Sequence, residues 1–119
     1  MKKILIIDDE PTTVKLLEGS LASAGFEVLT ANDGMEGMVL AQKEKPALII
    51  VDIFMPNLDG MAFIQEIKQS NDLKYLSIIV LSGQPGLAER LKQLGVFHYF
   101  VKPPDAKKIV EKVKTLTAG

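Results

Sequence analysis

Short runs of apolar residues alternate along the chain with longer segments whose apolar residues recur at helical spacing. The clearest run, Leu48 to Val51, has four consecutive apolar residues and ends at a carboxylate, Asp52. An uninterrupted apolar run of this length is typical of a strand that is buried on both faces of a parallel sheet. By the same pattern, further strands are predicted at Lys3–Ile7, 27–30, Ser77–Leu81 and Val96–Val101.

Helices are predicted between these runs. Pro11 suits the first turn of a helix, and the glycines at 25 and 95 are typical of the residue that follows a helix. Gly37 is expected to weaken the second helix by up to ~1 kcal/mol relative to Ala. The predicted helices are 11 to about 25, a segment after the 32–34 turn to about 45, 59–69, 87–94, and a last one carrying Ile109, Val113 and Leu116.

Strands that alternate with helices through short connections predict βαβ units and a parallel sheet with helices on both faces. Because the crossovers are right-handed, every strand then ends at the same edge of the sheet. The polar side chains at those ends are Asp8, Asp9, Asp52, Ser82 and Lys102. They are far apart in the sequence, yet this fold would bring them together.

The composition is that of one folded domain over residues 1–119, with 47% hydrophobic and 24% charged residues. The 14 basic and 15 acidic residues give a net charge of −1, and only one basic residue, Arg90, is an arginine. No basic stripe stands out, so direct nucleic-acid binding is not expected. The absence of cysteine excludes disulfides, thiolate metal sites and thiol nucleophiles.

The amino-terminal apolar run is too short for a signal peptide, because it meets Asp8 after four residues. No apolar stretch approaches the length of a membrane span, so no membrane association is expected. These features favour a cytoplasmic protein.

Three carboxylates in one cleft, Asp8, Asp9 and Asp52, repel one another and require positive charge nearby. Lys102 supplies one charge, and a divalent cation would supply the rest. Oxygen ligands without cysteine or a suitable histidine favour Mg²⁺ or Mn²⁺ over zinc. Such a site suits phosphoryl transfer, with Asp52 as the nucleophile. Lys102 and the Ser82 hydroxyl could each hold a phosphoryl oxygen.

These residues form a pattern that resembles the receiver domain of bacterial two-component response regulators, and the resemblance covers essentially the whole chain. The motifs in order are Asp8-Asp9-Glu10, Asp52 with Met55-Pro56 and Asp59-Gly60, Ser82-Gly83, and Tyr99 with Lys102-Pro103. Each motif is weak alone, but together and in this order they are specific. The resemblance implies a flavodoxin-like (βα)5 doubly wound sheet of order 2-1-3-4-5.

The resemblance also implies a function for each of these residues. Asp52 would accept a phosphoryl group from a histidine kinase or phosphotransfer protein. Asp9, Asp52 and the backbone carbonyl of Phe54 would bind Mg²⁺, with Asp8 acting through water and no organic cofactor. Such a domain is no enzyme, because it catalyses only its own phosphorylation and dephosphorylation. The Lys102-Pro103 peptide would be cis.

Phosphorylation would act as a switch in a protein of this family. Ser82 would move toward the phosphoryl group, Tyr99 would turn inward, and the surface of the fourth helix, fifth strand and fifth helix would bind an output protein or domain. A phosphorylation-dependent homodimer is a further form that the resemblance allows.

Three features depart from the commonest receivers. The segment from Ser82 to Lys102 is shorter, which predicts a shortened fourth helix or preceding loop. Phe54 replaces a residue that is often polar, and its ring could hinder the water that removes the phosphoryl group. Phe97 also stands at a usually polar position, where it is either a partner contact or an ordinary exposed apolar residue.

Four other interpretations compete with this one. The acids at 8–10 could simply favour the start of the first helix. A flavin carrier of the same fold would need a phosphate-cradling loop where this chain has acids. An aspartate-nucleophile phosphatase resembling the haloacid-dehalogenase group would need an acid at the position of Phe54. A phosphorylation-independent interaction module is the remaining alternative.

Overall fold

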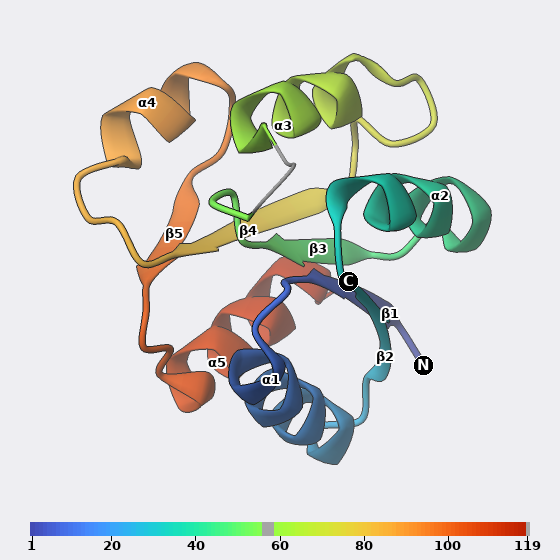
Figure 1. Ribbon diagram of the computed structural model, residues 1–119. Helices are drawn as coiled ribbons and strands as arrows, with labels where there is room; N and C mark the ends of the chain where they lie inside the picture. The colour runs from blue at the N-terminus through green and yellow to red at the C-terminus, as the bar shows by residue number, and fades with distance from the viewer. Residues whose placement is uncertain (56–58, 119) are drawn as a thin grey trace.

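The computed structural model describes residues 1–55 and 59–118 of the chain. Its centre is a parallel sheet of five strands in the order β2-β1-β3-β4-β5, flanked by helices on both faces (Figure 1). This confirms the fold and the strand order expected from the sequence. The strands are β1 Lys3–Ile7, β2 Glu27–Ala31, β3 Leu48–Val51, β4 Ser77–Ser82 and β5 His98–Val101. The helices are α1 Pro11–Ser23, α2 Gly34–Glu44, α3 Gly60–Gln69, α4 Ala88–Gln93 and α5 Ala106–Thr117.

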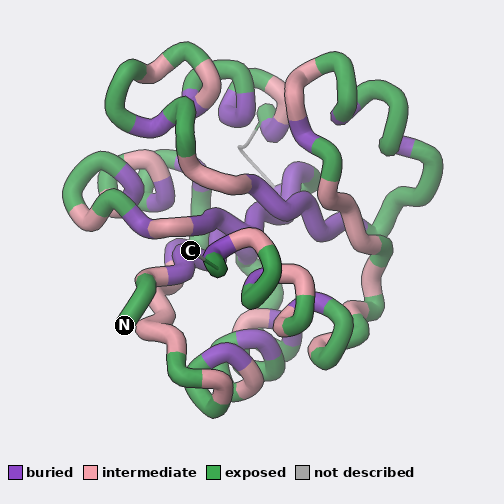
Figure 2. Tube along the Cα trace, turned by 180° about the vertical axis from the view of Figure 1, so that it is seen from behind, coloured by how far each residue is buried: buried purple, intermediate pink, exposed green. Residues whose placement is uncertain are grey.

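Successive residues of the central strands pack into two separate cores, one on each face of the sheet. On one face, Leu5 and Ile49 belong to a cluster with side chains of α2, α3 and α4. On the other face, Ile4 and Ile50 belong to a cluster with α1 and α5. Figure 2 shows buried residues along the strands and on the inward sides of the helices. Burial on both faces explains why these strands are continuous apolar runs.

Two predicted elements are shorter than the sequence pattern indicated. The fourth helix is Ala88–Gln93 rather than 87–94, and the fifth strand begins at His98 rather than at Val96. The cause is the turn around Gly95, whose φ is +83°. There the Val96 amide donates to the Leu91 carbonyl at 2.9 Å, so Val96 closes the helix and cannot pair in the sheet.

The predicted second and fourth strands each extend one residue further. Ala31 pairs with Ile7, and Ser82 pairs with Val101. The pairing of Ser82 matters for the site, because it fixes this hydroxyl-bearing residue in the sheet. The Pro56 part of the Met55-Pro56 motif lies outside the described residues.

Gly37 has a packing role that its helix propensity did not reveal. A Cβ added at this position would lie 2.5 Å from the Ile7 Cδ1 atom, and Ile7 is fully buried. The missing side chain therefore lets α2 approach β1 closely, which accounts for a glycine inside a helix. Across the described ranges, no helix has the length and hydrophobicity needed to cross a bilayer.

Candidate functional site

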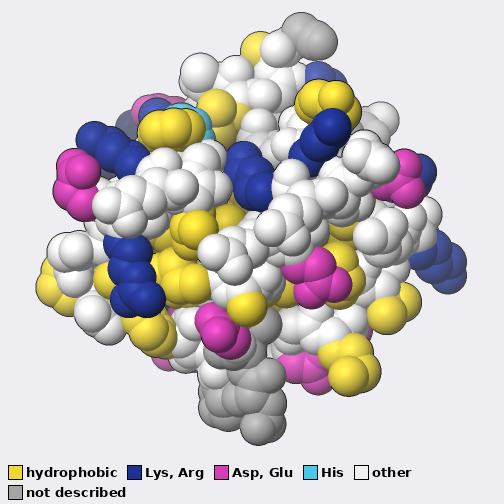
Figure 3. All heavy atoms as spheres, turned by 90° about the horizontal axis from the view of Figure 1, so that it is seen from above, with side chains coloured by type: hydrophobic (Ala, Val, Ile, Leu, Met, Phe, Trp, Pro, Cys, Tyr) yellow, Lys and Arg dark blue, Asp and Glu magenta, His cyan; other side chains and the backbone are white. Residues whose placement is uncertain are grey.

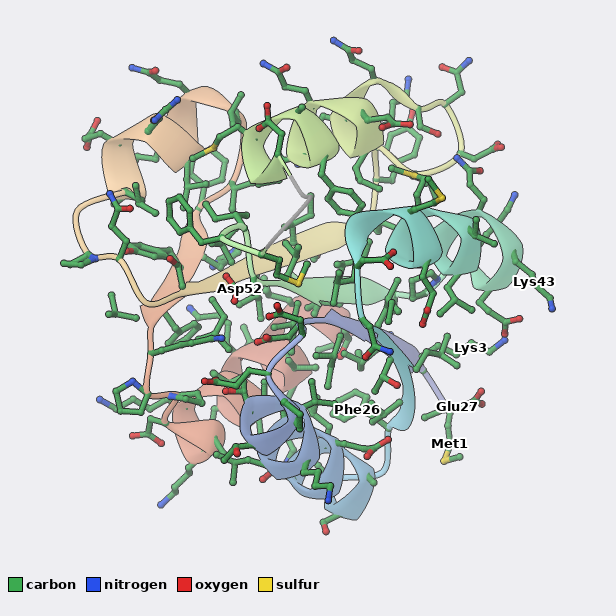
Figure 4. All side chains as sticks on the ribbon, viewed as in Figure 1. Met1, Lys3, Phe26, Glu27, Lys43 and Asp52 are labelled. Carbon is green, nitrogen blue, oxygen red and sulfur yellow. The ribbon has the colours of Figure 1, made fainter. Side chains whose placement is uncertain are left out.

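The predicted site residues meet at the carboxyl ends of the strands. Asp8 directly follows β1 and Asp52 directly follows β3, while Ser82 is the last residue of β4 and Lys102 follows β5. Backbone hydrogen bonds align these ends: the Asp52 amide donates to the Ile7 carbonyl at 2.9 Å, and the Lys102 amide donates to the Ser82 carbonyl at 2.7 Å. Figure 4 shows Asp52 where β3 ends, above the loop from β1 to α1.

The Lys102 ammonium group is the cation at the centre of this cluster. Its Nζ atom lies 3.0 Å from Asp52 Oδ2 and 3.0 Å from Asp8 Oδ2. Both carboxylates are buried, with exposed fractions of 2% for Asp8 and 6% for Asp52. Glu10, which is exposed, places its Oε1 atom 3.3 Å from the same ammonium. One lysine thus faces three carboxylates that come from two different loops.

The two buried aspartates are held in the same way by their own loops. Asp8 Oδ1 accepts a hydrogen bond from the Glu10 amide at 2.9 Å, and Asp52 Oδ1 accepts one from the Phe54 amide at 2.9 Å. A short side chain that bonds the backbone two residues ahead is a common way to fix a turn. Each aspartate therefore has its other oxygen, Oδ2, directed at Lys102.

The electrostatics of the cluster follow from burial and charge. Burial raises the pKa of the Asp8 carboxyl, and the Glu10 amide and the Lys102 ammonium only partly offset this. Burial lowers the pKa of Lys102, but its contacts with Asp52 and Asp8 outweigh that effect and raise it above the usual range. For Glu10, the Thr13 hydroxyl and then Lys102 lower the pKa. Lys102 is therefore a permanent cation in this site.

The acidic residues fit a divalent metal ion. Asp8, Asp9 and Asp52 each offer a carboxylate oxygen, and these atoms all lie within 4.8 Å of one another. Asp8 Oδ2 is buried and, within the part of the chain that the structure describes, makes no hydrogen bond of good geometry despite its ion pair with Lys102. Carboxylate oxygens at this spacing, one of them lacking a hydrogen-bond donor, are suited to Mg²⁺ or Mn²⁺.

Ser82 and Tyr99, the predicted switch residues, are connected through one residue, Gln84. Ser82 is fully buried, and its Oγ atom accepts a hydrogen bond from the Gln84 amide at 3.0 Å. The Tyr99 hydroxyl donates to the Gln84 carbonyl. The Lys102-Pro103 peptide next to β5 is cis, as the resemblance implied. The Gln84 backbone therefore contacts both predicted switch residues, Ser82 through its amide and Tyr99 through its carbonyl.

A hollow of about 400 Å³ opens above Asp52. Phe54 is 52% exposed and lines this hollow together with Asp52, so its side chain does not belong to the core. The lining residues are Asp9, Glu10, Asp52, Phe54, Gly83, Gln84 and Lys102.

Two members of the site were not assigned from the sequence. The sequence places Glu10 in the Asp8-Asp9-Glu10 motif without predicting a contact for it. In the structure it is the N-cap residue of α1 without a side-chain cap, and it contacts Lys102. Gln84 acts through its backbone, so no side-chain pattern could have indicated it. Asp52 has no capping role for the next helix, since Asp59 caps α3 by accepting from the Ala62 amide at 3.1 Å.

Comparison with known protein families gives one match over nearly the whole chain. A family described as "Response regulator receiver domain" matches residues 4–114. The chain is 38% identical over 117 residues to the probable transcriptional regulator ycf27 of Cyanophora paradoxa, covering 97% of this chain and 48% of that protein. It is 30% identical to protein PilH of Pseudomonas aeruginosa, with 100% of both covered. The chain thus spans about half the length of the ycf27 relative and all of PilH.

Solved structures give the same result. The chemotaxis response regulator CheY4 of Vibrio cholerae superposes with a TM-score of 0.88 at 28% identity, covering 98% of each chain. Response regulator TrrA of Thermotoga maritima, solved in complex with Mg²⁺ and BeF, gives a TM-score of 0.86 at 34% identity, covering 98% of this chain and 99% of that one.

The central position of Lys102 leads to a stability prediction. Replacing Lys102 with methionine leaves two buried carboxylates without their cation, which should lower the free energy of unfolding by about 1–3 kcal/mol in metal-free buffer. Lys92→Met is the control, because Lys92 makes only an exposed pair with Glu89 and should cost less than about 0.5 kcal/mol. Urea unfolding with a chelator present measures both. Equal stability of the two variants would contradict the arrangement.

Proposed function

This chain belongs to the response regulator receiver domain family of two-component signalling, and on that premise we propose that residues 1–119 form a receiver domain that accepts a phosphoryl group on Asp52. The observation that carries the proposal is the position of the Lys102 ammonium, 3.0 Å from both Asp52 and Asp8. This position supports the proposal because a phosphoryl group on Asp52 would be an anion, and the Lys102 ammonium already lies beside Asp52 to pair with it.

The proposed reaction transfers a phosphoryl group from a histidine nitrogen of the donor protein to a carboxylate oxygen of Asp52. A carboxylate oxygen of Asp52 attacks the phosphorus of a phosphohistidine, the P–N bond breaks, and an acyl phosphate forms as the imidazole leaves. Lys102 holds a phosphoryl oxygen as a point charge, and the Ser82 hydroxyl can donate to another. Asp8, Asp9, Asp52 and the Phe54 carbonyl would hold Mg²⁺, which neutralises charge that develops on the phosphoryl oxygens.

The switch would begin at Ser82. A phosphoryl group adds negative charge and acceptor oxygens beside this buried hydroxyl, which now accepts a hydrogen bond from the Gln84 amide. Turning the hydroxyl toward the phosphoryl group would break that bond and move the backbone that holds the Tyr99 hydroxyl. We propose that this alters the surface of α4, β5 and α5, where an output protein or domain binds.

The partners follow from the proposed chemistry. The phosphoryl donor would be a histidine kinase or phosphotransfer protein. The output would be an attached domain if this chain is part of a protein like ycf27, or a separate protein if it acts like PilH. A homodimer that forms on phosphorylation is a third form the output could take.

The phosphoacceptor is tested with acetyl phosphate and intact-mass measurement. In the presence of Mg²⁺, the wild-type protein should gain the mass of one phosphoryl group, and Asp52→Asn should gain none, because the amide is no nucleophile. Asp72→Asn, which changes an exposed aspartate outside the cluster, should react like the wild type. A wild-type protein that stays unmodified, or an Asp52→Asn protein that reacts equally well, would refute the assignment.

Phe54 should control how long the phosphoryl group remains. Its half-exposed ring borders the hollow above Asp52 and would block the water that attacks phosphorus. Phe54→Asn should therefore lose the phosphoryl group faster, roughly tenfold, since a polar side chain can orient that water. Loss of mass with time after removal of acetyl phosphate gives the rate. Phe97→Asn is the control, because Phe97 is exposed and lies outside the hollow above Asp52. Equal rates of phosphoryl loss in both variants would contradict this role of Phe54.

A further inference from the structure

A second hollow lies at the edge of the sheet opposite to Asp52. It has a volume of about 290 Å³. The lining residues are Lys68, Lys74, Tyr75, Leu76, Ser77, Ile78, Gly95, Phe97 and His98. Ser77 begins β4 and Ser82 ends it, so five residue steps, roughly 17 Å, separate this hollow from the phosphoacceptor site. The hollow is therefore not part of that site.

The charged groups of this hollow are all basic. Lys68 and Lys74 supply the charge, His98 also lines the hollow but burial lowers its pKa, and no acidic residue among those described lines it. The Lys74 ammonium lies 5.2 Å from the centre of the Tyr75 ring, and the Lys68 side chain passes beside Gly95. Asp72, the aspartate nearest in sequence, is directed at Lys45 at 4.0 Å. Among the described residues neither lysine of the hollow has a carboxylate partner within 4.0 Å, so both are available to an anion.

Exposed aromatic side chains flank these lysines. Tyr75 is 82% exposed and Phe97 is 68% exposed, which makes them the two most exposed aromatic residues that the structure describes. They come from different loops, one before β4 and one before β5, yet they line the same hollow. In the upper part of the view in Figure 3, basic side chains (Lys or Arg) lie between exposed hydrophobic ones. Aromatic residues are enriched at protein interfaces relative to the rest of the surface, and two of them at one hollow therefore favour a docking site.

We propose that this hollow docks an acidic segment of a partner protein. One aromatic or aliphatic side chain of that segment packs between Tyr75 and Phe97, and neighbouring carboxylates pair with Lys68 and Lys74. The volume of about 290 Å³ is just below the range for small-molecule sites, ~300 Å³ upwards, which fits a single side chain better than a whole ligand.

A nucleic acid is the less suitable occupant. The chain has a net charge of −1, and only two lysines face this hollow. Polynucleotide binding depends on many phosphate contacts along a basic groove, which two cations cannot supply. The site lies at the opposite edge of the sheet from Asp52, so this docking goes beyond the proposed phosphoacceptor function and does not depend on it.

Peptide selection tests the docking. A displayed library of random linear peptides is selected against the wild-type protein, and the affinity of the best peptides is measured by fluorescence anisotropy. We expect acidic sequences that contain an aromatic or aliphatic residue. Their affinity should fall at least roughly tenfold for the double variant Lys68→Glu with Lys74→Glu, by loss of two ion pairs. The matched control is Lys15→Glu with Lys43→Glu, which makes the same change of charge on exposed residues of α1 and α2 and should bind as the wild type does.

A second variant tests the apolar part. Tyr75→Ser with Phe97→Ser should also weaken binding, and a cooperative thermal melt shows that each variant is folded. The proposal is overturned if no peptide is selected, if the selected peptides are not acidic, or if they bind both lysine variants equally. It is also overturned if a thymidine oligonucleotide, or a second copy of the chain detected by sedimentation, binds the wild type and is lost with Lys68→Glu and Lys74→Glu.

Discussion

One electrostatic constraint organises this domain: two buried carboxylates, Asp8 and Asp52, share a single ammonium group, that of Lys102. Burial disfavours their charge and raises the pKa of Asp8, while the lysine stabilises the charged form. With Asp9 beside them, negative charge still exceeds positive charge in the cluster. The cluster is therefore suited to a divalent cation, and the Lys102 ammonium lies where it could pair with an anion at Asp52. The proposed phosphoryl transfer would use both features.

The fold makes this arrangement possible at modest cost. Strands β1, β3 and β4 are buried on both faces, so their positions are fixed by two hydrophobic cores rather than by the polar cluster. Parallel pairing then aligns the strand ends, as the hydrogen bond from the Asp52 amide to the Ile7 carbonyl shows. The two cores therefore hold the carboxylates close together although these groups repel one another.

The fold and most of the site could be predicted from the sequence, because apolar runs mark buried strands and each run ends at a polar residue. The contacts of Lys102 with Asp8 and Asp52 followed from that placement. The contacts of Glu10 and Gln84 could not be predicted in this way. The contact of Glu10 with Lys102 depends on the rotamer of an exposed side chain, and Gln84 bonds Tyr99 through its backbone carbonyl. The shorter β5 was also missed, because the Gly95 turn uses Val96 to close α4. Gly37 looked like a weak point, and only the contact with Ile7 explains it.

The most direct test of the charge balance is the dependence of folding stability on Mg²⁺. An ion that binds only the folded chain raises the free energy of unfolding with its concentration, by about 1.4 kcal/mol at ten times its dissociation constant. The account predicts this rise for the wild type and its loss in Asp9→Asn, whose side chain is exposed and contributes little else to the fold. Urea unfolding across a Mg²⁺ series measures it. A stability that does not change with Mg²⁺, or that rises equally in Asp9→Asn, would contradict a metal site formed by these carboxylates.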